Sequence, residues 1–231
     1  MASRPEVHRY GEHASQLCEL HVPAGTDPAG VAVLIHGGFW RRRYGLELEG
    51  GIARDLVARG WAVWNVEYRR LGDGGGWPHT LDDVRAAIGA LPLAADRVVA
   101  IGHSAGGQLA VWAAAEGLVS AAVSQAGALD LHELARLGTS DNVVHQFLGG
   151  TPDEVPHRYD AASPARRLPI GVPLLLVHGE RDDDVPAHVS REFAAAAGDD
   201  CELVVIGDES HYEHLEPGSR CWEAVIEWLS R

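Results

Sequence analysis

A serine between two glycines is the first feature of the chain that could do chemistry. The letters Gly-His-Ser-Ala-Gly fill residues 102–106, directly after an apolar run and directly before a helical pattern. A serine on such a sharp turn exposes its hydroxyl at the edge of a sheet, and the flanking glycines let strand and helix approach each other. We therefore predict that Ser104 is a nucleophile; the alternative is a glycine-rich turn without chemistry.

Adjacent glycines after another apolar run predict donors for a developing negative charge. Residues 31–35 lead into His36, two glycines, Phe39 and Trp40. Such a loop can turn backbone N–H groups toward one point, and each donor to an oxyanion lowers an acyl-transfer barrier by about 3–4 kcal/mol. We assign the N–H groups of Gly38, Phe39 and Ala105 to this oxyanion hole. We expect His36 to brace the loop by hydrogen bonds rather than to act as a base.

An acidic turn and a histidine follow two later apolar runs. A carboxylate in the turn can accept the Nδ1–H of an imidazole and stabilise the imidazolium. Three consecutive aspartates leave the choice open from chemistry alone, with Asp182 preferred and Asp184 as the alternative. His211, the first imidazole after the last run, is the predicted base, and His214 is expected at the surface or in the pocket lining. The order serine, aspartate, histidine is one of the orders known for such triads.

Hydrophobic periodicity predicts the elements that position these residues. Short apolar runs, typical of strands buried on both faces, alternate with longer amphipathic or apolar helical patterns. This alternation predicts an α/β fold of three layers, with a mostly parallel central sheet flanked by helices, in a single domain over residues 1–231. The predicted strands are 31–35, 61–66, 97–101, 119–123, 172–177 and 202–206, and the predicted helices are 48–59, 80–91, 105–115, 186–197 and 219–229.

Residues 128–168 interrupt the alternation with turn signals and short helical pieces. The stretch is too long for a simple crossover, so we predict a small excursion, a partial lid, over one end of the sheet. In an open α/β sheet that end is where ligands bind.

Composition narrows the function classes. The formal net charge of −14 disfavours nucleic acid and anionic membrane surfaces as partners. Three cysteines without C-x-x-C spacing and an N-terminus without an apolar core favour a soluble, cytoplasmic protein. The sequence predicts no metal site, because His132 and Glu133 are followed by Arg136, where a zinc-binding helix needs a second histidine. No cofactor is expected. The Arg41, Arg42 and Arg43 run is expected to be a solvated loop.

From about residue 19 to residue 228 the chain resembles the α/β-hydrolase family. The letters His-Gly-Gly-Phe-Trp at 36–40 look like the H-G-G-x-W motif of kynurenine formamidases and their bacterial esterase-like relatives. Glu-Tyr-Arg-Arg at 67–70, Ser-Pro at 163–164, His-Gly-x-x-Asp at 178–182 and His-Tyr at 211–212 resemble further motifs of that group. The resemblance implies Ser104, Asp182 and His211 as the triad, which selects Asp182 over Asp184.

We accordingly expect a serine hydrolase that cleaves carboxylic esters or aryl amides through an acyl-enzyme. The expected partner is a small ester or amide, held by Trp40, Trp77, His103 and His214, and the chain is expected to be a monomer or homodimer. A peptidase-like amidase is the alternative among enzymes. A non-catalytic ligand-binding protein on the same fold is the alternative outside them, although such proteins usually lose a triad member and none is missing here.

Overall fold

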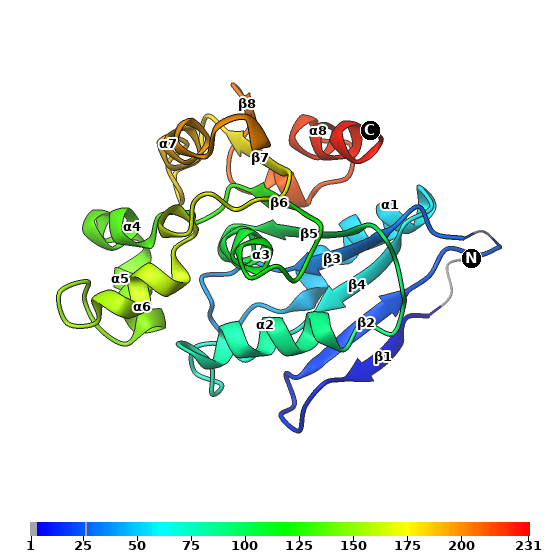
Figure 1. Cartoon of the computed structure of the whole chain (residues 1–231), viewed down its shortest axis with the longest axis horizontal. Helices are drawn as coiled ribbons and strands as arrows, with labels where there is room; N and C mark the ends of the chain where they lie inside the picture. The colour runs from blue at the N-terminus through cyan, green and yellow to red at the C-terminus, as the bar shows by residue number, and fades with distance from the viewer. Residues whose placement is uncertain (1–3, 26) are drawn as a thin grey trace.

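The computed structural model describes residues 4–25 and 27–231, so residues 1–3 and 26 of the predicted domain lie outside it. Within the described residues, one mixed sheet has the strand order β1-β2-β4-β3-β5-β6-β7-β8. Neighbours from β4 to β8 along this order pair in parallel. The carboxyl ends of these strands therefore meet at one edge (Figure 1). The predicted α/β fold with a mostly parallel sheet is confirmed.

The parallel strands lie where the apolar runs predict them, but three of them continue further. Strands β5, β6 and β7 end at His103, Gln125 and Gly179, each two residues past the predicted end. These added residues carry polar side chains to the carboxyl edge. The bounds are β3 Val31–Ile35, β4 Ala62–Val66, β5 Val98–His103, β6 Ala121–Gln125, β7 Leu174–Gly179 and β8 Cys201–Ile206.

Two N-terminal strands were not predicted. Strand β1 (Glu6–Arg9) pairs antiparallel with β2 (Leu17–His21), which pairs antiparallel with β4. In β2 the residues Cys18 and Leu20 are buried and alternate with half-buried ones. This period of two is the signature of a strand with one face in the core, and it was available in the sequence.

Helices cover both faces of the sheet, which gives the predicted three layers (Figure 1). Helices α1 (Gly50–Ala58) and α8 (Arg220–Leu229) share one buried cluster with one set of strand side chains. The other face packs against α2, α3 and α7. Their bounds are α2 His79–Gly89, α3 Ala105–Ala115 and α7 His188–Ala197, and short 3-10 helices lie at η1 Leu46–Glu49, η2 Pro164–Arg166, η3 Gly198–Asp200 and η4 Glu213–Leu215.

The predicted excursion contains three short helices, α4 (Leu131–Leu137), α5 (Thr139–Leu148) and α6 (Pro156–Ala162). They lie together at one side of the molecule, next to α3 (Figure 1). The side chain of Asp130 caps α4 by accepting hydrogen bonds from the N–H groups of His132 and Glu133. The helices of the excursion thus begin and end at local signals, and they pack together beside the carboxyl edge.

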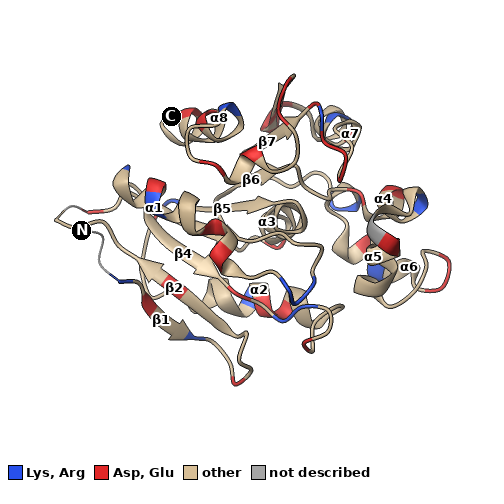
Figure 2. Ribbon diagram, turned by 180° about the vertical axis from the view of Figure 1, so that it is seen from behind, with Lys and Arg blue, Asp and Glu red and all other residues tan. Residues whose placement is uncertain are grey.

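Acidic side chains are spread widely over the molecule. Figure 2 shows Asp and Glu on strands, helices and loops in most parts of the view, with arginine, the basic residue of this lysine-free chain, in shorter stretches among them. In the described part of the chain, no helix combines the length and apolar character needed to cross a bilayer.

One acidic side chain is buried instead. Glu49, the last residue of η1, is 1% exposed, and its Oε1 has no hydrogen-bond partner among the described residues. Burial raises the pKa of this carboxyl to about 8. The group is therefore a neutral acid at neutral pH, which avoids most of the cost of burying a charge.

Replacing Glu49 by glutamine is expected to change how stability depends on pH. The folded chain keeps this carboxyl protonated up to about pH 8, whereas the unfolded chain ionises it near about pH 4.3. The folded state binds one more proton in this window, so the free energy of unfolding falls as the pH rises through it. Urea unfolding at pH values near the two ends should show wild type losing stability relative to Glu49→Gln at the higher pH.

The matched control is Glu47→Gln, at an exposed position of the same 3-10 helix. Its difference from wild type should stay constant with pH. A difference between wild type and Glu49→Gln that does not change with pH would contradict the assignment of a raised pKa.

Candidate active site

Ser104 occupies the turn between β5 and α3 in a strained backbone conformation. Its φ is 56° and its ψ is −118°, in the region that L-residues rarely adopt. Hydrogen bonds hold this conformation from both sides. The Ser104 N–H donates to the Gln125 carbonyl at 2.8 Å, and its own carbonyl accepts from the N–H groups of Gln108 and Ala128. The turn is thus fixed by backbone contacts with β6 and α3.

The glycines of the motif are required by close backbone approach. A Cβ on Gly106 would collide with the Ile35 carbonyl, and a Cβ on Gly102 would collide with the Gly106 carbonyl. Helix α3 therefore crosses the ends of β3 and β5 at backbone distance. The reason given for these glycines from the sequence is confirmed by this geometry.

Asp182 and His211 lie together at the carboxyl edge. The Nδ1–H of His211 donates to Asp182 Oδ2 at 2.6 Å, and Asp182 Oδ1 accepts the N–H groups of Asp184 and Val185 at 2.9 and 2.8 Å. His178 Nε2 lies 3.2 Å from Asp182 Oδ2. Burial alone would raise the pKa of this carboxyl, but the bonds from His178, His211 and Val185 outweigh it and hold the pKa well below its ordinary value.

The alternative acid, Asp184, holds a different side chain. Its Oδ2 accepts a hydrogen bond from the Tyr212 hydroxyl at 2.8 Å. This bond and partial burial raise the pKa of Tyr212 to about 12. Asp184 therefore contacts the neighbour of His211, while Asp182 contacts its ring.

Ser104 and His211 are brought to the same corner through His103. The rings of His103 and His211 are 4.6 Å apart between centroids, and Ser104 follows His103 in the chain. Among the described residues, the Ser104 hydroxyl makes no hydrogen bond. Such a contact between nucleophile and base is often long or poorly aligned without substrate and tightens in the substrate complex.

The glycine loop after β3 packs against the serine turn. A Cβ on Gly37 would lie 3.1 Å from the Ser104 Cβ. The next three residues, Gly38, Phe39 and Trp40, have φ values of 102°, 57° and 53°, so the loop is strained over consecutive positions. In the described part of the chain, the N–H groups of Gly38, Phe39 and Ala105 donate no hydrogen bond. They are the three donors that the sequence assigned to an oxyanion.

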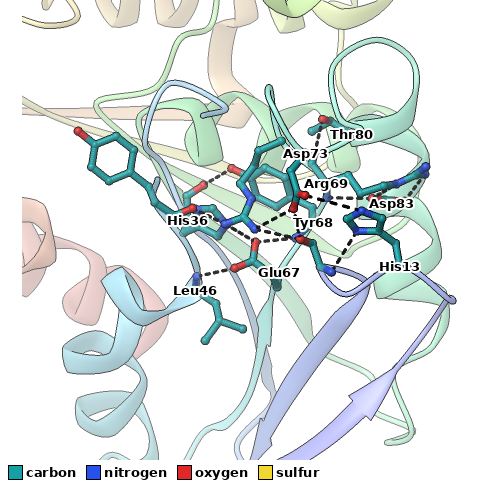
Figure 3. A network of polar contacts seen from close by, with 12 residues as sticks. His13, His36, Leu46, Glu67, Tyr68, Arg69, Asp73, Thr80 and Asp83 are labelled. Atoms are coloured by element: carbon teal, nitrogen blue, oxygen red, sulfur yellow. Dashed lines mark hydrogen bonds and ion pairs between the residues drawn. The ribbon is translucent and has the colours of Figure 1, made fainter. Parts of the chain in front are cut away.

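A network centred on Glu67 braces this loop (Figure 3). Glu67 accepts hydrogen bonds from His36 Nε2 at 3.0 Å and from the N–H groups of Tyr68 and Leu46 at 2.9 and 3.1 Å, and it pairs with Arg70 at 3.0 Å. Although burial would raise the pKa of Glu67, the bond from His36 and the charges of His36 and Arg70 lower it. Together, these ion pairs and hydrogen bonds hold the glycine loop after β3 in place.

His36 has an acceptor at each ring nitrogen. Nδ1 is 2.7 Å from the Gly37 carbonyl and Nε2 is 3.0 Å from the Glu67 carboxylate. Each ring nitrogen is thus placed to donate to an oxygen when it carries a proton. Tyr68 stacks on the ring at 4.4 Å and donates its hydroxyl to the His36 carbonyl. His36 is thus a fully buried brace, as expected.

A small cavity lies beside Ser104, with a volume of about 20 Å³. Its walls are mostly apolar and come from the glycine loop after β3, the serine turn, the excursion and the loop after β7. They are formed by Phe39, Trp40, Ser104, Ala105, Ala128, Leu134, Thr139, Val143, Val144, Asp184 and Val185. The excursion therefore forms one side of the candidate site, as its position in the sequence indicated.

One of the four predicted substrate-binding residues lines this cavity. Trp40 does so, with its indole N–H donating to Gln108 Oε1 and its ring stacked on Phe147 at 4.4 Å. His103 is buried beneath the turn that carries His211, and Trp77 packs against the core near Phe147. His214 belongs to that turn and is fully buried, so its expected place at the surface is wrong. Substrate binding by His103, His214 and Trp77 stays a prediction, and their observed contacts are with the protein.

The arginine run behaves as a loop with local partners. Arg42 donates to the Gly72 carbonyl at 3.2 Å, and the guanidinium of Arg43 lies 4.6 Å from the centre of the Tyr44 ring. Within residues 4–25 and 27–231, no group of three or more His, Cys, Asp or Glu side chains is arranged to hold a metal ion.

Sequence reasoning missed Glu67 and Gln125 as parts of the site. Glu67 was noted only as a letter of a motif, and its contact with His36 spans 31 positions in the chain. Gln125 holds the turn after β8 through the His214 carbonyl. A polar residue at the end of an otherwise apolar strand was the available signal, because that edge of the sheet gathers such ends.

Fold and site together define an esterase-like α/β hydrolase. The match to the family described as BD-FAE covers residues 18–196, and the chain belongs to that family. It is 26% identical over 222 residues to the esterase LipC of Mycobacterium tuberculosis (strain ATCC 25618 / H37Rv), covering 82% of this chain and 55% of LipC. The chain thus spans about half the length of that relative.

A second relative and a solved structure extend the likeness. Kynurenine formamidase avaC of Aspergillus versicolor is 26% identical over 229 residues, which covers 79% of this chain and 81% of avaC. A truncated carbohydrate esterase from gut microbiota superposes with a TM-score of 0.86 at 18% identity, covering 99% of this chain and 96% of that one. This last likeness supports the fold.

Replacing Glu67 by glutamine should loosen the brace behind the oxyanion loop. The amide keeps one acceptor but removes the charge that pairs with His36 and Arg70, so we expect the free energy of unfolding to fall by about 1–3 kcal/mol. Urea unfolding measures this loss. The control Glu6→Gln, at an exposed position on β1, should leave stability within about 0.5 kcal/mol of wild type. Equal stability of the two variants would mean that the network does not hold the loop.

Proposed function

We propose that this chain is a serine esterase that cleaves esters or aryl amides of small acyl groups. Ser104 is the nucleophile, His211 the general base and Asp182 the acid that orients the base. The N–H groups of Gly38, Phe39 and Ala105 form the oxyanion hole. The observation that carries the proposal is the short hydrogen bond between Asp182 and His211. It lies beside a serine with a strained backbone and beside backbone N–H groups that donate no hydrogen bond in the described part of the chain.

The steps follow from the proton positions. Because His211 Nδ1 donates to Asp182, its Nε2 carries a lone pair and can take the Ser104 hydroxyl proton. The serine oxygen bonds to the carbonyl carbon, and the carbonyl π electrons move to the oxygen, which the backbone donors stabilise. The leaving group departs with the proton from His211. Water then attacks the acyl-enzyme by the same route and releases the acid.

The relatives support the substrate class without defining it. One is named an esterase and another a kynurenine formamidase, and the site geometry suits either acyl group transfer. Since the chain spans 55% of LipC, the activity of the whole LipC protein comes to this chain only as a proposal. For the alternative, a peptidase-like amidase, no observation on the described residues speaks in favour.

The free thiols of Cys18, Cys201 and Cys221 support a reducing compartment, and we propose the cytoplasm.

Ser104→Ala should abolish turnover of p-nitrophenyl acetate while the unfolding curve stays close to wild type. Asp182→Asn should lower kcat by about 10⁴-fold, as loss of this acid does in serine proteases, because the imidazole then takes the wrong tautomer. Initial rates with the chromogenic ester measure both effects, and covalent labelling by a fluorophosphonate reports on Ser104 alone.

Asp183→Asn is the matched control for the acid, since Asp183 lies in the same turn and is exposed. It should keep wild-type turnover. Undiminished turnover by Ser104→Ala would end the proposal, whereas loss of activity in Asp184→Asn but not in Asp182→Asn would reassign the acid.

The cavity beside Ser104 limits the size of the acyl group. The free space there is small, about 20 Å³, and Phe39, Trp40, Leu134 and Val143 are among the residues that wall it. Formyl and acetyl groups therefore require the least displacement of these walls, and longer acyl chains require more movement of Trp40, Leu134 or Val143. The same observation favours N-formyl aryl amines as a second candidate substrate beside short esters.

Acyl-chain preference tests this limit. Each methylene that a pocket cannot accept costs about 1–3 kcal/mol, or roughly 10–200-fold in kcat/KM. We expect p-nitrophenyl acetate to exceed the butyrate by at least about tenfold, and Val143→Ala to narrow this ratio. Val7→Ala, at an exposed position on β1, should leave the ratio unchanged. Equal turnover of acetate and octanoate by wild type would show that the cavity does not hold the acyl group.

A further inference from the structure

Two buried side chains from neighbouring strands hold the turn that carries His211. His103, the last residue of β5, has its Nε2 2.6 Å from the His211 carbonyl. Gln125, the last residue of β6, donates from Nε2 to the His214 carbonyl at 3.1 Å. His103 is 3% exposed and Gln125 is fully buried. Side chains at the ends of β5 and β6 thus hold the carbonyls of two residues of one turn, which are three positions apart in the chain.

The contact fixes the protonation of His103. A carbonyl only accepts, so His103 Nε2 must carry the proton and donate it. Burial and the neighbouring His211 lower the pKa of His103 to about 3, so the ring is neutral at neutral pH. It faces His211, Asp182, His178, His214 and Tyr212, and a second positive charge there would oppose the imidazolium formed at His211.

These two hydrogen bonds hold the backbone of the proposed base, and the rate of the reaction is sensitive to the distance between this base and Ser104. Asp182 holds the ring of His211 through Nδ1 at 2.6 Å, but this single bond does not hold the backbone that carries the ring. The backbone of His211 must also be held for Nε2 to stay aimed at Ser104. A displacement of about 1 Å at a reacting group can cost about 10²-fold in rate.

We propose that His103 is a positioning residue that, together with Gln125, holds the backbone of the catalytic base through the His211 and His214 carbonyls. The inference rests on the proposed function, since it concerns the base of that reaction. It assigns His103 to the support of the triad rather than to substrate contact.

His103→Leu and His103→Gln separate this role from packing. Leucine fills the site but has no donor, so it should lower kcat for p-nitrophenyl acetate by about 10–100-fold with KM changed less than about twofold. Glutamine can place an N–H near the position of Nε2 and should restore most of kcat. The low-field proton resonance of the bond between His211 and Asp182 should be broadened or shifted in the leucine variant and kept in the glutamine variant.

Gln125→Leu is the second variant, in case His103→Leu fails to fold. It removes the donor to the His214 carbonyl and should also lower kcat with little change in KM. His21→Leu, on β2 at the far side of the sheet, controls for loss of a half-buried histidine and should keep wild-type kcat.

The outcomes distinguish this inference from the proposed function. If Ser104→Ala is inactive while His103→Leu and Gln125→Leu both keep wild-type kcat, the positioning role is wrong and the esterase proposal stands. If glutamine at 103 is as impaired as leucine, the donor is not what matters and the positioning role is again wrong. If Ser104→Ala keeps its activity, the proposed function itself fails.

Discussion

The close approach of backbone at the crossing of β3, β5 and α3 is the constraint on which the rest of the site depends. At Gly106 there is no room for a side chain against the Ile35 carbonyl, and at Gly102 none against Gly106 itself. Packing at this distance forces the turn between strand and helix into the strained conformation seen at Ser104. It also sets the first N–H of α3 next to the loop that leaves β3. One backbone contact therefore places Ser104, the proposed nucleophile, next to the N–H groups proposed to stabilise the oxyanion.

Buried polar groups complete the edge of the sheet, and they are tolerable because they are paired. Glu67 balances His36 and Arg70 behind one loop, and Asp182 accepts bonds from His211 and from two backbone N–H groups in another. Each carboxylate keeps its charge against burial because of these partners. Where no partner exists, as at Glu49, the carboxyl stays protonated instead. At these two loops, paired charge therefore holds the backbone in place without leaving a buried carboxylate uncompensated.

The sequence predicted the features that local residues determine, and it missed those that depend on contacts between distant parts of the chain. The glycines around Ser104 announce a tight turn whatever surrounds them, and apolar runs reveal strands buried on both faces. Because the prediction ended each strand where its apolar run ends, it placed the ends of β5, β6 and β7 two residues too early. His103, Gln125 and His178 are polar, and they find their partners only at the edge of the folded sheet. Strand β2 was missed although Cys18 and Leu20 alternate as a strand requires. The choice between Asp182 and Asp184 was open from chemistry, since only the fold shows which carboxylate meets the ring of His211.

The loop after β3 and the excursion are linked through Trp40. This residue continues the loop in a left-handed conformation, lines the cavity beside Ser104, and stacks on Phe147 of α5. Its indole N–H bonds to Gln108 of α3, whose amide in turn donates to the Ala162 carbonyl at the end of α6. A change in how the excursion packs would therefore reach the oxyanion loop through one side chain. If the cavity holds the acyl group and the loop supplies the oxyanion donors, as we propose, the size of the accepted acyl group and the rate of the chemical step are expected to vary together.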